Sequence, residues 1–235
     1  MKRLLIIALL AAITTITASA QPYDYDVDQL RDEWNKTITV PNSDAPIVEK
    51  LFQAWNKKFP TGFAEIFDTY KKTGKPGDDD FKVDYAPKNG FIEIFGEYYF
   101  IADVDGNYLK GDTITKNQIC QAVYWNLPNG NKLFGVSVLV TGECFDNCAV
   151  FFYEYNAAKG TLAPRADIVK RVMDKVGDDT EIFVQLPKVG RDLRYNDFNS
   201  LNDKIIKWNG NGFYCPTGRN LTNPLQICIK EICKI

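Results

Sequence analysis

Carboxylates are the side chains through which this chain could do acid–base chemistry, because it contains no histidine. Without an imidazole, a serine triad, a cysteine–histidine dyad and a histidine metal site are all excluded. The candidates are Glu93, Glu97 and Glu154, which lie on or beside stretches with strand character. A glycosidase needs two carboxyl groups about 5 to 9 Å apart, one on each side of a sugar. A carboxylate-based, glycan-active enzyme using these glutamates is therefore one hypothesis.

Strand alternation gives the same glutamates a second interpretation. Ile92 and Ile94 share one face of their strand, so Glu93 points to the other face. Glu154 alternates in the same way within residues 151–155. Sheets with one wet face carry carboxylates there routinely. We therefore favour a protein without catalytic residues, and keep the enzyme as the alternative.

The cysteines are even in number, and all six lie in the second half of the chain. They are Cys120, Cys144, Cys148, Cys215, Cys228 and Cys233. In an exported chain this pattern favours disulfides, and the short spacing suggests that Cys144 pairs with Cys148. Two close pairs of thiolates could instead bind zinc, although exported thiols usually oxidise before they meet zinc. We predict at least two disulfides, no metal site and no cofactor.

Aromatic side chains on the expected strands offer a binding surface. Tyr99, Trp125, Tyr153 and Trp208 are the candidates, because alternate residues of a strand face outward. An exposed aromatic strip could stack on sugar rings or hold a protein partner. An aromatic core covered by helices would account for the same residues. A glycan-binding module without catalysis is therefore a further hypothesis.

Four other motifs match known sites only in part. The run 103–107 resembles a calcium loop, but the sixth and twelfth places of an EF-hand loop would hold Tyr108 and Ile114. The acidic run 78–80 is typical of a solvated loop. Ser200 and Lys204 are one residue too far apart for a Ser-x-x-Lys pair. Residues 208–213 contain two glycines, but their spacing fits a tight hairpin better than a phosphate loop.

Helical spacing appears in three places. Apolar residues at helical intervals predict a helix from Pro46 to about Lys58, and a second helix from Phe63 that stops before Gly74. These two should form a helical hairpin with a shared apolar face. A third helix is expected over 165–176. Residues 21–40 are acidic and turn-rich, and we expect a loosely packed N-terminal arm there.

Period-two runs separated by short turns predict an antiparallel meander, because parallel strands need long crossovers. The expected strands are 81–85, 91–95, 98–103, 119–127, 132–141, 149–155, 181–186 and 205–208. The predicted fold class is α+β, with the helical hairpin packed on the sheet and one further helix. Residues 41–235 are expected to form a single domain, with a division near residues 75–80 as the alternative.

The first twenty residues have the order of a secretory signal peptide. Lys2 and Arg3 precede an apolar run, and small residues at Ala18 and Ala20 suit cleavage before Gln21. We therefore expect a periplasmic or secreted protein whose mature chain has no membrane span. Cleavage would lower the formal net charge from -2 to -4, because the leader carries two basic residues and no acidic ones. Nucleic-acid binding is improbable at this charge, since basic residues occur only as scattered pairs.

Several short sequence segments in the last third of the chain are similar to segments of other exported proteins. They are Phe151–Asn156 followed by residues 160–164, then residues 183–187, and finally Trp208 to Gly210 before Phe213. With the signal ending at Ala20, they resemble uncharacterised secreted proteins of Bacteroidetes-type bacteria. The resemblance implies an envelope or extracellular setting and carries over no catalytic residue. The leading hypothesis is a non-catalytic exported protein that binds an unknown protein or glycan.

Overall fold

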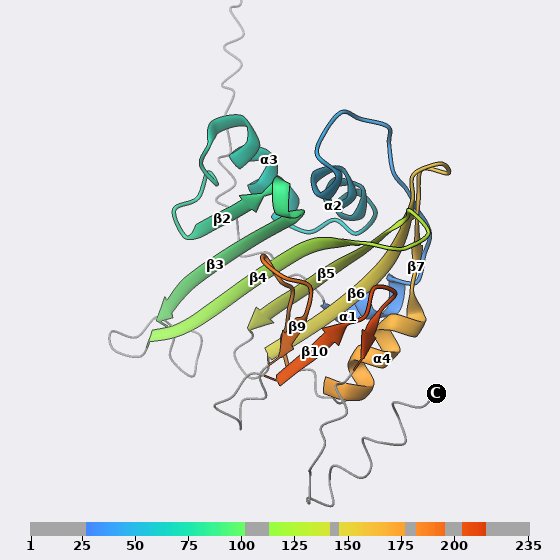
Figure 1. Ribbon diagram of the computed structural model, residues 1–235. Coiled ribbons are helices and arrows are strands. Elements are labelled where there is room, and N and C mark those ends of the chain that lie inside the picture. Colours follow the sequence, from blue (N-terminus) through green and yellow to red (C-terminus); the bar gives the residue numbers. More distant parts are fainter. Residues whose placement is uncertain (1–26, 102–112, 142–145, 177–181, 196–203, 215–235) are drawn as a thin grey trace, which may run out of the picture.

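The structure is a computed structural model, and it describes residues 27–101, 113–141, 146–176, 182–195 and 204–214. A seven-stranded antiparallel sheet forms its centre, with strand order β1-β7-β6-β5-β4-β3-β2 (Figure 1). Strands β2 to β6 follow one another in the sheet as they do in the chain, which confirms the predicted antiparallel meander. The strands are β1 (Ile38–Thr39), β2 (Phe81–Ala86), β3 (Phe91–Ile101), β4 (Thr113–Asn126), β5 (Lys132–Thr141), β6 (Asp146–Asn156) and β7 (Thr161–Pro164).

Three helices cover one face of this sheet. They are α1 (Val27–Glu33), α2 (Ile47–Lys58) and α3 (Phe63–Thr73), and the last two form the predicted hairpin. The rings of Phe52 on α2 and Phe67 on α3 meet edge to face at 5.5 Å. Because apolar residues recur along one side of both helices, this layer buries a dry core against Ile92, Phe134 and other sheet residues.

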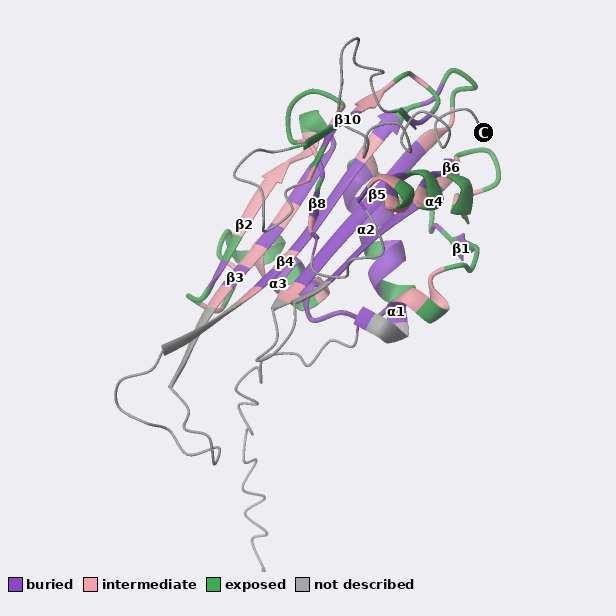
Figure 2. Ribbon diagram, turned by 90° about the horizontal axis from the view of Figure 1, so that it is seen from below, coloured by how far each residue is buried: buried purple, intermediate pink, exposed green. Residues whose placement is uncertain are grey.

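The other face of the sheet is covered as well, which corrects the expectation of one wet face. A four-stranded antiparallel sheet with the order β11-β10-β9-β8 lies there together with helix α4 (Figures 1 and 2). Its strands are β8 (Val184–Gln185), β9 (Leu193–Tyr195), β10 (Lys204–Trp208) and β11 (Phe213–Tyr214), and α4 spans Ala166–Val176. Their inward side chains form a second core with Val123, Leu133 and Phe152 of the large sheet. The central strands are therefore buried on both faces.

The N-terminal arm differs from the prediction. Val27 and Leu30 of α1 are buried in the helical-face core, and Ile38 of β1 pairs with Leu162 of β7. The segment is therefore part of the fold over its described residues. The apolar residues of this segment are too few and too widely spaced for the sequence pattern to predict a packed helix and strand.

Strand β3 runs without a break through Gly96, where a division into two strands was predicted. A Cβ atom at Gly96 would lie 2.4 Å from the ring of Phe81, on the neighbouring strand. Glycine is required there so that an aromatic ring can lie directly over the backbone. The residue that suggested a turn is thus a close contact between two strands.

Among the described residues, no helix has the length and apolar character needed to cross a membrane.

Candidate binding surface on the small sheet

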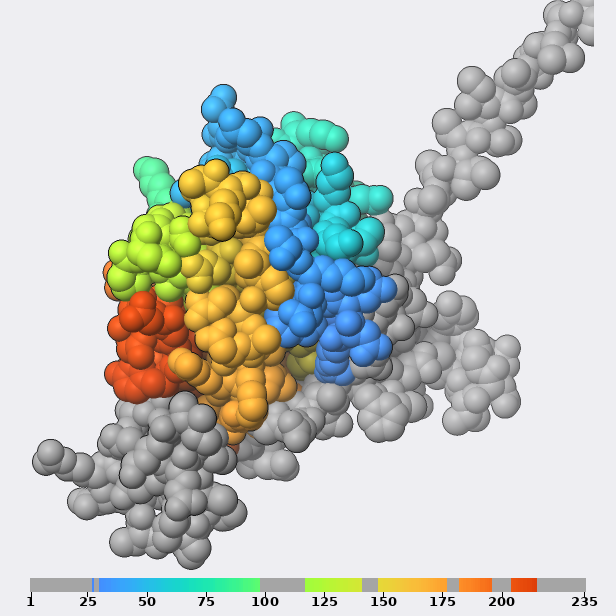
Figure 3. Space-filling model, turned by 90° about the vertical axis from the view of Figure 1, so that its right-hand side faces the viewer, coloured from blue at the N-terminus to red at the C-terminus, as the bar shows by residue number. Residues whose placement is uncertain are grey.

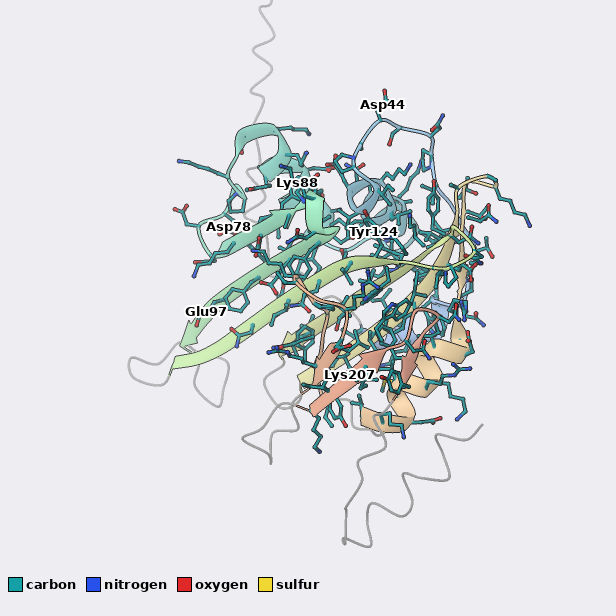
Figure 4. All side chains as sticks on the ribbon, viewed as in Figure 1. Asp44, Asp78, Lys88, Glu97, Tyr124 and Lys207 are labelled. Atoms are coloured by element: carbon teal, nitrogen blue, oxygen red, sulfur yellow. The ribbon has the colours of Figure 1, made fainter. Side chains whose placement is uncertain are left out.

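The three candidate catalytic glutamates do not come together. Glu93 and Glu97 share a face of β3 and are four residues apart, about 13 Å along the strand. Glu154 lies three strands from Glu93, about 14 Å across the sheet. Each separation exceeds the spacing that a pair of glycosidase carboxyl groups requires. Figure 4 shows Glu97 towards the end of β3, away from Lys207 on the small sheet.

Glu154 is fixed by hydrogen bonds at the end of the β4–β5 hairpin. Its Oε1 accepts hydrogen bonds from Asn131 at 2.7 Å and Asn129 at 3.0 Å, and its Oε2 forms an ion pair with Arg165 at 2.9 Å. The hydrogen bond from Asn131 is the largest of the influences that lower the pKa of Glu154. Such a carboxylate stays ionised and stabilises the turn, which is unsuited to a general acid.

Glu93 belongs to a polar row that positions the loop after β8. Gln121 on β4 donates a hydrogen bond from its Nε2 to Glu93, and its Oε1 accepts one from the backbone N–H of Leu186 at 2.8 Å. A carboxylate only accepts hydrogen bonds, so Glu93 fixes the orientation of this amide. The row thus links the large sheet to the small one.

Asp84 holds the same loop by charge. It lies directly opposite Glu93 in the β2–β3 register, and its carboxylate forms an ion pair with Lys188 at 2.5 Å. Cross-strand neighbours of this kind are about 5 Å apart, which is within the spacing of glycosidase carboxyl groups. However, Asp84 and Glu93 are both occupied in holding residues 186–188. This arrangement favours a positioning role for Glu93.

The predicted aromatic strip does not form on the large sheet. Tyr153 is fully buried on the helical face, where its hydroxyl donates a hydrogen bond to the carbonyl of Trp34 at 2.9 Å. Trp125 is also buried, on the opposite face, and stacks on the half-buried Trp208 at 5.8 Å. The side chain of Tyr99 lies outside the described residues. The helix-covered core interpretation therefore holds for Tyr153, while the small sheet covers Trp125.

Exposed apolar side chains gather instead on and beside the outer face of the small sheet. The described residues include three large hydrophobic side chains that are exposed, namely Val189, Ile205 and Tyr214, and Val189 is 82% exposed. Ile205 shares the outward face with Arg194, its partner in the β9–β10 register, and with Lys207, which pairs with Tyr214 on β11. Figure 3 shows β10 and β11 in red at the surface beside α4. Clustered exposed apolar side chains of this kind indicate an interaction site.

A cavity of about 430 Å³ adjoins this face, between the β8–β9 loop and strands β9 and β10. Four cationic residues and one acidic residue line it, namely Lys188, Arg191, Arg194, Lys207 and Asp192. Its apolar lining comes from Leu186, Pro187, Val189 and Ile205. In a chain with a formal net charge of -2, four cations and one anion thus lie together around this cavity.

Asp192 organises the charges beside the cavity. Its carboxylate forms an ion pair with Lys207 at 2.7 Å and accepts a hydrogen bond from the backbone N–H of Trp208 at 2.9 Å. Burial works against ionisation, but these two partners outweigh it and lower the pKa of Asp192. The charges of Lys188 and Lys207 are therefore balanced by Asp84 and Asp192. Arg191 makes no ion pair with any described residue, and its backbone carbonyl accepts the Nε1–H of Trp125 at 3.0 Å.

The sequence pattern predicts strands over 181–186 and 205–208, but it misses β9 and β11, which are three and two residues long, and therefore misses this surface. One feature of the sequence that pointed to this surface is the run Lys-Val-Gly-Arg at residues 188–191, where a valine lies between two cationic residues. Gly190 has φ +91°, a left-handed conformation that favours glycine, and the chain bends over residues 188–191.

A second polar cluster that the sequence did not indicate lies between the helices and β2. Glu49 on α2 is buried. Its Oε2 accepts a hydrogen bond from the hydroxyl of Tyr85 at 2.7 Å and forms an ion pair with the Lys71 ammonium at 2.9 Å. The Lys71 ammonium also lies 4.7 Å from the centre of the Tyr85 ring. Burial and the neighbouring carboxylate raise the pKa of Tyr85. The three side chains thus provide one another's hydrogen-bond and charge partners, and they connect both helices to β2.

The cysteines give no disulfide within the described ranges. Cys120 is a free thiol, so any disulfides must form among the other cysteines, and burial in the helical-face core raises the pKa of Cys120. Cys148 shares a face with Leu139 and Ile119, opposite to that of Cys120, so these two cysteines cannot pair. Cys144, Cys215, Cys228 and Cys233 lie outside the described residues, and their pairing stays a prediction.

The weaker motifs supply no site in the part of the chain that the structure describes. Asp78 accepts a hydrogen bond from the backbone N–H of Asp80, as expected for a turn in an exposed loop. The run 103–107 and Ser200 lie outside the described residues. Where residues are described, no cluster of three or more cysteine, aspartate or glutamate residues could hold a metal ion.

Comparison with known proteins gives no relative from which a function could be transferred to this chain. The chain matches no protein-family model, and no curated protein or solved structure matches it either.

Proposed function

We propose that this is an exported, non-catalytic binding protein whose small sheet binds an acidic segment of a partner protein. The observation that carries the proposal is the clustering of the described exposed hydrophobics, Val189, Ile205 and Tyr214, around one basic face. Tyrosine and arginine are enriched at protein interfaces, and apolar contact provides affinity there. The signal-like leader supports export.

The charge pattern supports the chemistry of the partner. Arg191, Arg194 and two lysines surround the cavity beside Ile205, with Asp192 as the one acidic residue in its lining. An acidic partner would gain favourable long-range attraction, and a basic one would be repelled. The concave, partly apolar shape favours a segment with side chains that can enter it over a flat membrane surface.

The separation of Glu93, Glu97 and Glu154 argues against the glycan-active alternative. Glu154 is fixed by Asn129, Asn131 and Arg165, and Glu93 by Gln121. None of these carboxylates lines the cavity beside the small sheet. A non-catalytic role therefore fits the described residues better.

The test uses an acidic random copolymer of glutamate and tyrosine as the probe, with the full chain exported from cells. We expect binding that weakens as salt is added, because exposed charges are screened. Ile205→Glu should weaken binding by at least about tenfold, since like charges at a contact cost more than 1.4 kcal/mol. The matched control is Thr39→Glu, at an exposed strand position on the far edge of the large sheet.

A photo-crosslinking residue placed at Tyr214 in the exporting cell identifies the natural partner. Adducts should contain an acidic protein segment, and the same residue at Gln53 on α2 should give none. Preferential binding to polygalacturonate or to anionic vesicles would replace the protein partner with a glycan or a membrane. Equal effects of Ile205→Glu and Thr39→Glu on copolymer binding would refute the proposed surface.

A further inference from the structure

We infer that the cavity beside the small sheet is a subsite for one carboxylate group attached to an aliphatic body, with Arg191 as its counter-ion. This inference deepens the proposed function and rests on it, since the carboxylate would belong to the partner's acidic segment. It depends on three features of the cavity, which are its charge balance, its apolar lining and the way its loop is held.

The charge balance favours a singly charged group. Lys188 is paired with Asp84 at 2.5 Å, and Lys207 with Asp192 at 2.7 Å. Arg191 lines the same cavity and has no ion-pair partner among the described residues. A guanidinium can bind a carboxylate through two parallel hydrogen bonds. Arg194, the fourth cation of the lining, has an interaction of its own and is not free. A phosphate dianion would need a second uncompensated cation beside Arg191, so the carboxylate fits better.

The apolar lining specifies what the carboxylate is attached to. Leu186, Pro187, Val189 and Ile205 contribute to the cavity, and Val189 and Ile205 remain exposed. Covering them with an aliphatic group would remove apolar surface from water. The volume of about 430 Å³ is within the range of small-molecule sites and suits one side chain with its neighbouring backbone.

The loop that carries Arg191 is held at several points, so the subsite is largely formed before binding. The backbone N–H of Leu186 donates a hydrogen bond to Gln121, and Lys188 forms an ion pair with Asp84. The carbonyl of Arg191 accepts a hydrogen bond from the Nε1–H of Trp125. Preformed geometry reduces the entropy that binding must overcome. The Trp125 indole is hydrogen-bonded to the backbone of Arg191, so its environment should change when a ligand binds Arg191.

The experiment titrates the full exported chain with N-acetyl-leucine and follows backbone amide shifts of residues 184–194 by NMR. We expect saturable shifts with a Kd on the order of 1 mM, as the size of this ligand allows. N-acetyl-leucinamide has the same body without the charge, and should bind at least about tenfold more weakly. N-acetyl-glutamine, which has the carboxylate on a polar body, should also bind more weakly. Inorganic phosphate tests a free anion.

Arg191→Gln should weaken N-acetyl-leucine binding at least about tenfold. Lys159→Gln, which removes one exposed cation from the β6–β7 turn, should leave it within about twofold. Loss of binding in both variants, tighter binding of phosphate, or equal binding of the amide would each overturn the subsite. Copolymer binding that is intact in Arg191→Gln while N-acetyl-leucine fails to bind the unmodified chain refutes only the subsite. N-acetyl-leucine binding that requires Arg191, without copolymer binding, refutes only the proposed protein partner.

Discussion

The two faces of the large sheet are covered in different ways, and the difference separates stability from recognition. Helices α1 to α3 close one face over a core that includes Trp55, Phe134 and Tyr153, each fully buried. The other face is covered by a small sheet whose inner side chains are buried but whose outer face keeps Ile205 and Tyr214 exposed. The helical layer therefore completes the core, while the second layer both completes a core and presents a surface.

Ionisable groups follow the same division. On the helical face, burial raises the pKa of Tyr85, Tyr153 and Cys120. On the other face, the pKa values of Glu154 and Asp192 are lowered, chiefly through hydrogen bonds and ion pairs that outweigh burial for Asp192. The helical face thus holds three groups that burial keeps neutral, beside the charged pair of Glu49 and Lys71, whereas Glu154 and Asp192 on the other face must stay charged.

The largest expected effect comes from the helical-face core. Phe134→Ala should lower the free energy of unfolding by about 3 to 5 kcal/mol, because a fully buried ring leaves a cavity. Ile205→Ser on the outer face should lower it by less than about 1 kcal/mol. Urea unfolding followed by circular dichroism measures both. Similar losses for the two variants would mean that the outer face of the small sheet is not exposed to solvent.

An intermediate effect is expected where the two layers meet. Gln121→Leu should lower the free energy of unfolding by about 1 to 3 kcal/mol, since it leaves the buried N–H of Leu186 without its acceptor. Gln53→Leu, at an exposed position on α2, is the matched control and should be nearly neutral. Hydrogen exchange of the Leu186 amide should be faster in Gln121→Leu and unchanged in the control. An unchanged rate in both would contradict the positioning role of the polar row.

High pH should weaken the helical face. The folded-state pKa of Tyr85 is raised, so its contribution is complete below its unfolded pKa of about 10 and is lost as the pH rises above it. Tyr85→Phe should reduce the loss of stability between pH 9 and about 11, in proportion to this one ionisation. Thermal unfolding across that range measures it. Tyr124, at the β4–β5 end, serves as the control through Tyr124→Phe, for which the alkaline loss should persist.

Low pH should weaken the other face by a smaller amount. The folded-state pKa of Glu154 is lowered, so its contribution is present above the unfolded pKa of about 4.3 and is lost as the pH falls through the folded value. Glu154→Gln should make unfolding less sensitive to acid below about pH 4, because the titrating group is gone. Denaturation midpoints at pH 3 and pH 6 test this. Equal acid sensitivity in both proteins would show that Glu154 does not contribute.

Local patterns predicted the elements that carry strong periodicity. The helical hairpin over α2 and α3, helix α4 and strands β2 and β5 lie near their predicted positions, because each repeats one hydrophobic period several times. Strand β4 ends near its predicted end but begins at Thr113, six residues before its predicted start. The predicted strands 181–186 and 205–208 contain or match β8 and β10, whereas β9 and β11 are only three and two residues long and are too short to show a period. The candidate surface was missed because it forms only when these four strands pair with one another.

The sequence by itself determined the absence of imidazole chemistry, the α+β class and the antiparallel order of the main strands. The tertiary structure decided which faces are covered. Glu93 and Glu154 alternate outward from their strands as predicted, yet a second layer packs over that face. Glu93 is linked to that layer through Gln121 and Leu186, and Glu154 pairs with Arg165 just before α4. Alternation along a strand gives the face on which a side chain lies, but only long-range packing determines whether that face meets water, another sheet or a partner.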